Sequence, residues 1–161
     1  MPVIIDGTNG ITYPNSTIQA SAGQVLQVVN ASYGTTVSNS TNVYADTGLT
    51  ATITPKFNTS KILALITFGQ VQKTSANANN DLSINLVRNG TEINQLTKET
   101  LLTGTATALN MALAFQYYDS PASTSALTYK CQFKNNDVNG AAVSVQGSSI
   151  LSNITLMEIA A

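Results

Sequence analysis

Apolar and polar residues alternate one by one along much of the chain, which is the period of a β-strand with one buried face. In residues 49–54, three apolar side chains alternate with threonines until Pro55 ends the pattern. In residues 127–134, four apolar side chains alternate with polar ones in the same way. These segments predict strands that bury one face and expose the other.

Further segments extend this prediction. Residues 82–87 alternate just before Asn89-Gly90, a dipeptide typical of tight hairpin turns, and residues 109–117 alternate as well. Residues 61–71 are apolar at positions of both parities, so we expect a central strand that is covered on two sides. The last strands are expected in residues 143–145 and 150–159.

Helical patterns are scarce. Residues 96–102 are the best candidate for one or two helical turns, but Thr97 and Thr100 weaken it because β-branched residues disfavour helices. About eight strands with polar turns between them predict an all-β fold, an antiparallel β-sandwich of the jelly-roll kind.

The first 23 residues differ from the rest of the chain. Glycine and asparagine interrupt them often, and their apolar pieces are too short to build a core. Apolar side chains are unexpected in a solvated tail, so we expect residues 1–23 to form an extended arm that orders on a partner or on sister chains. The globular domain is expected in residues 24–161. The arm residues expected to make the attachment are Ile4, Ile11, Tyr13 and Ile18.

Composition argues against catalysis. The 161 residues include no histidine, no tryptophan and one cysteine, with 7 Lys and Arg and 8 Asp and Glu. Chemistry near neutral pH usually needs a group that titrates there, or a metal held by imidazole or thiolate. We therefore expect no enzyme, cofactor or metal site. With no histidine to activate it, Cys131 is expected to be a small buried hydrophobic residue.

The net charge of −1 gives no field that would attract nucleic acid or an anionic membrane. No stretch approaches the length of a membrane span, and Met1–Asp6 lacks the basic start of a signal peptide. We expect a soluble protein made in a cytoplasm, with no nucleic-acid partner and no membrane insertion. Ser, Thr and Asn make up about a third of the chain, so hydroxyls and amides must cover its surface, as suits dense symmetric assemblies.

Three loops are rich in short amides and hydroxyls, in residues 74–80, 119–125 and 135–140. Such groups, beside aromatic rings, bind sugar hydroxyls, and function concentrates on loops held by a rigid scaffold. Plain solvated turns remain the alternative for each loop. The candidate receptor-binding residues are Asn77, Asn79, Asn80, Tyr118, Asn135 and Asn136.

Residues 7–22 read Gly-Thr-Asn-Gly-Ile-Thr-Tyr-Pro-Asn-Ser-Thr-Ile-Gln-Ala-Ser-Ala. This resembles a motif of bacteriophage tail fibres and other virion surface proteins, Gly-x-x-Gly-Ile-Thr-Phe-Pro-Asp-Gly-Thr-x-Gln-x-Ser-Ala, most of all in phages of cyanobacteria. Tyr13, Asn15 and Ser16 depart from it but keep its turn chemistry. Short segments further along resemble the same proteins: residues 46–49, 53–55, 60–63, 86–91 and 156–159.

The resemblance implies a trimeric β-jelly-roll knob joined to the virion by its arm. It implies a non-enzymatic short tail fibre, assembled in the host cytoplasm, whose arm binds a baseplate or tail adaptor and whose knob binds a host surface polysaccharide. A capsid decoration protein that stabilises the head as a trimer is the alternative, and a free lectin or cytokine-like jelly roll is another. The residues expected at the trimer interface are Leu101, Leu109, Met111, Leu113, Leu156 and Ile159.

Overall fold

The computed structural model describes residues 4–6, 10–12, 23–74, 78–137 and 141–161, and almost all of its regular structure is β-strand. In chain order its elements are β1 (Ile4–Asp6), β2 (Gly10–Thr12), β3 (Val25–Tyr33), β4 (Val37–Asn39), β5 (Ala45–Ile53), β6 (Lys61–Lys73), β7 (Leu82–Arg88), β8 (Thr91–Thr100), β9 (Leu109–Asp119), β10 (Leu127–Asn135), β11 (Val143–Val145), the 3₁₀ turn η1 (Gly147–Ser149) and β12 (Ser152–Ile159).

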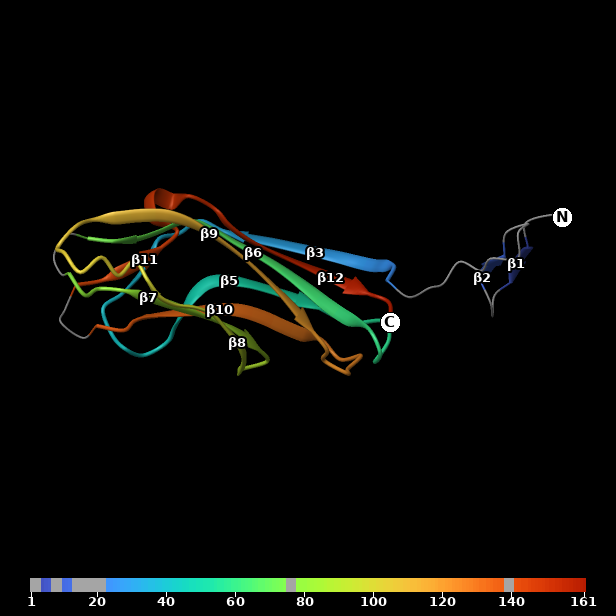
Figure 1. Ribbon diagram of the computed structural model, residues 1–161. Helices are drawn as coiled ribbons and strands as arrows, with labels where there is room; N and C mark the ends of the chain where they lie inside the picture. The colour runs from blue at the N-terminus through green and yellow to red at the C-terminus, as the bar shows by residue number, and fades with distance from the viewer. Residues whose placement is uncertain (1–3, 7–9, 13–22, 75–77, 138–140) are drawn as a thin grey trace.

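Two antiparallel sheets stack as the layers of a sandwich (Figure 1). One, which we call the β6 sheet, has the order β3-β12-β6-β9, and the short strands β11 and β4 continue it beside the far end of β6. The other, the β10 sheet, has the order β5-β10-β7-β8. The eight long strands, four in each sheet, pass back and forth between the two sheets as in a jelly roll, so the predicted antiparallel β-sandwich is confirmed.

The predicted strand β6 is central, since it pairs with β12 and β11 on one side and with β9 on the other. Its burial nevertheless alternates: Ile62, Ala64 and Ile66 are fully buried, whereas Leu63 and Leu65 are only half-buried. The expectation of cover on both faces is therefore wrong for the chain by itself. Among the described elements, η1 and the residues after it lie against the far end of this strand, where Gly147 approaches Gln70 and Gln72, and Leu63 and Leu65 stay uncovered.

The core lies between the two sheets and draws on both. In β10, Tyr129, Cys131 and Phe133 point inward and are fully buried, as their alternation predicted. Asn89 and Gly90 make the predicted tight turn between β7 and β8, and both take the positive φ angles that such a turn requires.

Residues 96–102 do not form a helix. Most of them belong to β8, which pairs with β7, and Leu101 turns its side chain into the core with a positive φ. The threonines that weaken a helix here favour a pleated strand, so local propensity and tertiary pairing agree.

The start and the end of the sandwich are tied together. The backbone N–H of Gly23 donates to the carbonyl oxygen of Ala160 at 2.6 Å. The backbone N–H of Ala160 donates in turn to the carbonyl oxygen of Gln24 at 2.8 Å. Strands β1 and β2 pair as a separate antiparallel hairpin, with Ile5 opposite Ile11, which lies apart from the two sheets (Figure 1).

Candidate assembly surface

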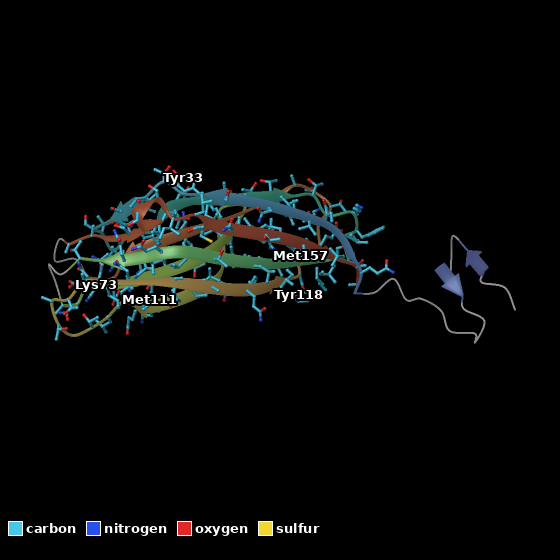
Figure 2. The ribbon with its side chains drawn as sticks, turned by 90° about the horizontal axis from the view of Figure 1, so that it is seen from above. Tyr33, Lys73, Met111, Tyr118 and Met157 are labelled. Carbon is cyan, nitrogen blue, oxygen red and sulfur yellow. The ribbon has the colours of Figure 1, made fainter. Side chains whose placement is uncertain are left out.

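The outer face of the β6 sheet presents a row of apolar side chains that crosses all four strands. Pairing places Met157 opposite both Val28 and Leu63, and Leu63 opposite Tyr118. Val28 and Tyr118 are more than half exposed, and Met157 and Leu63 are half-buried. Figure 2 shows Met157 and Tyr118 near the same end of the sandwich. Residues that face one way on neighbouring strands form a continuous surface, so these four act as one strip.

The neighbouring rows of this face are polar but uncharged. Thr155 lies opposite Asn30 and Leu65, and Leu65 lies opposite Gln116. At the outward positions of β3, β12, β6 and β9, all within the described ranges, Lys61 is the only charged side chain. We call this surface, made by the outward residues of the four strands, the uncharged face.

A shallow hollow of about 530 Å³ lies in the uncharged face between β6 and β9. It forms where Thr67 and Ala114 face each other, because both side chains are short and leave the backbone uncovered. The residues that line it are Leu65, Ile66, Thr67, Ala114, Phe115 and Gln116. An open, uncharged depression of this shape accepts a protruding side chain better than it holds a small molecule.

The outer face of the β10 sheet has the opposite character. Lys130 forms an ion pair with Asp46 at 2.8 Å, and the ammonium of Lys134 lies 5.2 Å from the centre of the Tyr44 ring. The Lys130 ammonium is the main cause that holds the pKa of Asp46 below its ordinary value. Glu92 also faces this side, where it accepts a hydrogen bond from Asn85. The charged groups on this face remain hydrated, and the cost of removing that water opposes contact with another molecule.

The residues expected at a trimer interface are distributed over the fold and do not form one surface. Leu101 and Leu156 are buried in the core of the chain itself, so the expectation that they face a neighbour is wrong. Leu109, Met111 and Leu113 also point inward, although they keep part of their surface exposed.

Ile159 is half-buried and points outward on the uncharged face. The sequence pattern did not single out its neighbours there, although Met157 lies two positions before Ile159 on β12 and on the opposite side from the buried residues Ile154 and Leu156. Apolar residues at both odd and even positions of β12 indicate that this strand has a second apolar face.

The expected receptor-binding residues do not converge either. Asn79, Asn80, Asn135 and Asn136 lie at the end of the sandwich where β7 begins and β10 ends, whereas Tyr118 lies at the opposite end. Figure 2 shows Tyr118 far from Lys73, which marks the first end. Asn77 lies outside the described residues. These residues therefore cannot contact one sugar together.

Two of these amides are also buried and hydrogen-bonded within the protein. Asn80 and Asn135 are fully buried. Asn135 donates to the carbonyl oxygen of Ala141 at 2.7 Å and to Asn80, and its own side-chain oxygen accepts the backbone N–H of Asp137 at 3.1 Å. This network fixes loop geometry, as buried amides commonly do, and corrects their assignment as receptor contacts.

Of the arm residues expected to attach to the virion, Ile4 lies in β1 and Ile11 in β2. Tyr13 and Ile18 lie outside the described residues.

A buried polar cluster joins the two sheets near Tyr118. Asp119, at the end of β9, accepts hydrogen bonds from Arg88 at 2.5 Å and from the hydroxyl of Tyr129 at 2.6 Å. Burial, with the neighbouring Asp119 carboxylate, raises the pKa of Tyr129 far above its ordinary value, so the phenol remains a donor. The cluster links β7, β9 and β10 and has the features of a structural tie.

Glu158 is a second buried acid. Burial acts to raise its pKa, but hydrogen bonds from the Gln27 amide and the backbone N–H of Lys56 outweigh burial and hold the pKa below its ordinary value. Gln27 also donates to the carbonyl oxygen of Thr54, so the carboxylate fixes the β5–β6 loop against β3 and β12.

The described residues contain no group of three or more metal-ligating side chains. Burial raises the pKa of the Cys131 thiol to about 12, which keeps it protonated and unreactive. Within the described part of the chain, no helix has the length and apolar character needed to cross a membrane.

No protein-family model and no curated protein sequence matches the chain. Among solved structures, the chain is similar to VP2 of infectious bursal disease virus in a subviral particle, with a TM-score of 0.52 and 14% identity over 83% of this chain. The chain spans 32% of that protein's length, and the likeness shows a shared fold.

Two other similarities are too weak to support a conclusion. Dimeric latent PorU of Porphyromonas gingivalis gives a TM-score of 0.36 and 10% identity over 88% of this chain and 14% of that one. The Gx strain of infectious bursal disease virus gives 0.38 and 11% over 99% of this chain and 47% of that one.

Proposed function

We propose that this protein is a non-catalytic structural component of a virus particle that assembles as a homotrimer through the uncharged face. The face itself is the observation that carries the proposal. In a symmetric assembly each residue near the axis meets its own copies, so a charge there repels itself. A broad sheet face with only Lys61, at its end row, avoids this cost and offers apolar surface to bury.

The fold supports the same class of function. The jelly roll is an architecture used by viral capsid and lectin domains, and a protein of the same fold over most of this chain's length forms a subviral particle. Fold alone does not assign function, so the uncharged face carries more weight than the likeness.

Within this class we propose a short tail fibre whose N-terminal arm binds a baseplate or adaptor and whose knob faces the host. The motif in residues 7–22 and the separate β1–β2 hairpin support this role. A capsid decoration protein is the second candidate. The burial of Asn80 and Asn135 favours this second candidate, because a decoration protein needs assembly contacts and no sugar-binding amides.

The test of assembly is the mass of the purified protein by light scattering at micromolar concentration. We expect a trimer for the native chain and a monomer for Leu63→Glu or Thr155→Glu, since either places three like charges in the interface. The matched control is Thr52→Glu, an exposed position on the outer face of the β10 sheet, which should stay trimeric. A native chain that is monomeric would overturn the proposal.

Electron microscopy of labelled particles separates the two roles. Label at the tail supports the fibre, and label over the head supports decoration. Free knob protein should also block adsorption of the virus to its host only if the protein is a fibre.

A further inference from the structure

Strand β9 is an unprotected sheet edge. It pairs only with β6 among the described strands, and its 11 residues contain no proline and no charge before Asp119 at the end. One register shift, between Phe68 and Val71 of β6, interrupts this pairing. Figure 2 shows it along one border of the molecule, from Met111 to Tyr118. Soluble proteins usually protect such edges with charges, prolines, bulges or a covering element, because unpaired N–H and C=O groups recruit another strand.

The other edges of the sandwich differ. Strands β3 and β5 pack against each other along one flank. Strand β8 carries Glu92, Lys98 and Glu99, and several register shifts interrupt its pairing with β7. On the flank of β9, the inward side chains Met111, Leu113 and Phe115 keep part of their surface exposed. An additional strand beside β9 would cover that surface.

The chain also contains a pair of strands that joins neither sheet of the sandwich. Strands β1 and β2 have three residues each and pair only with each other. An isolated two-stranded hairpin is marginal in water and needs a third strand or a packed face. Its residues are uncharged apart from Asp6, and Ile4, Ile5 and Ile11 make it apolar.

We propose that the β1–β2 hairpin of one copy adds to the β9 edge of a neighbouring copy and so locks the assembly. The 10 residues between Thr12 and Gly23 let the two ends lie at most about 40 Å apart when extended, enough to pass from one subunit to the next. A neighbour is the occupant because the hairpin lies apart from its own sandwich (Figure 1). Strand addition of this kind gains main-chain hydrogen bonds along the whole edge.

This inference rests on the proposed homo-oligomer, and photo-crosslinking separates the two. A photoreactive residue replaces Gln116, which lies exposed on β9, in the full-length chain. After irradiation, denaturing gels and peptide mapping should show crosslinks from β9 to residues 3–12 in a product of two or more chains. The same residue at Thr128, on the outer face of the β10 sheet, is the control and should give none.

A double variant, Ile5→Asp with Ile11→Asp, should lower the crosslink yield at least about tenfold, whereas Thr8→Asp, between the two strands, should not. A trimer without crosslinks to the hairpin overturns this inference and leaves the proposed assembly intact. Crosslinks within a single chain overturn it as well, because they show that the hairpin folds onto its own edge. A monomeric native chain overturns both proposals.

Discussion

The two outer faces of the sandwich come from one sequence of low charge, yet they divide that charge unequally. The outer face of the β10 sheet carries Asp46, Lys130, Lys134 and Glu92, whereas the uncharged face has only Lys61 at its end row. Scarcity of charge therefore does not dilute charges evenly over the surface. One broad face carries only Lys61, and this is the face through which we propose that the molecule meets other copies.

The difference between inside and outside is sharpest within one strand. Leu156 is fully buried and its neighbour Met157 faces outward. In the Leu63→Glu background, which removes assembly, Leu156→Ala should lower the free energy of unfolding by about 2–5 kcal/mol because it leaves a cavity. Met157→Ala should cost under about 1 kcal/mol. Urea unfolding followed by circular dichroism measures both. Equal losses would mean that the outward face is already packed within the subunit.

The tie between the two sheets should be the next largest contribution. Asp119→Ala removes the acceptor of both Arg88 and the buried Tyr129 hydroxyl, and we expect a loss of about 2–4 kcal/mol in the free energy of unfolding. Glu99→Ala breaks an exposed ion pair with Lys98 and should cost under about 1 kcal/mol. If the two variants unfold at the same urea concentration, the cluster does not hold the sheets together.

Glu158 should make stability depend on pH. Its pKa is lower in the folded chain than its ordinary value of 4.5. Its stabilisation is therefore complete above pH 4.5 and is lost as the pH falls through the lower folded pKa. Glu158→Gln should be less stable at pH 7 and should show a smaller decrease in melting temperature between pH 5 and pH 3. A variant with an unchanged decrease would assign the acid sensitivity to other carboxylates.

The ion pair between Lys130 and Asp46 should contribute least to the free energy of unfolding. Asp46→Ala is expected to cost about 0.2–1 kcal/mol, since Asp46 is exposed and salt screens the pair with Lys130. Trimer mass should be the same in 50 mM and 500 mM salt, because the uncharged face uses no charges to assemble. Dissociation at high salt would indicate that the interface is instead the outer face of the β10 sheet.

Strand alternation predicted most of the fold. The inward positions of β5 and β10 follow from the pattern in residues 49–54 and 127–134, because one face of each strand must be buried. The expectation that β7 exposes its other face is wrong, since Ser83, Asn85 and Val87 are buried as well. The Asn89-Gly90 turn was predicted by its backbone preference. Residues 96–102 were ambiguous, since strand pairing with β7 decided their conformation and pairing is not local information.

The candidate surface was harder to predict. Leu156 and Met157 are both apolar, and only the register of β12 between β3 and β6 shows which of them is inside. Asn80 and Asn135 looked like solvent-exposed loop amides, but their burial depends on contacts between segments 55 residues apart. Composition favoured an assembling surface, and topology was needed to show which face of the sandwich lacks charge.

The hydrogen bonds between Gly23, Gln24 and Ala160 have a practical consequence for experiments on this protein. They place the entry and the exit of the sandwich at one pole (Figure 1). A fluorescent protein fused after Ala161 would therefore crowd the pole at which the N-terminal segment enters the sandwich. A small epitope inserted near Gly104, an exposed turn residue at the other pole, would point away from that entry and leave the N-terminal segment free.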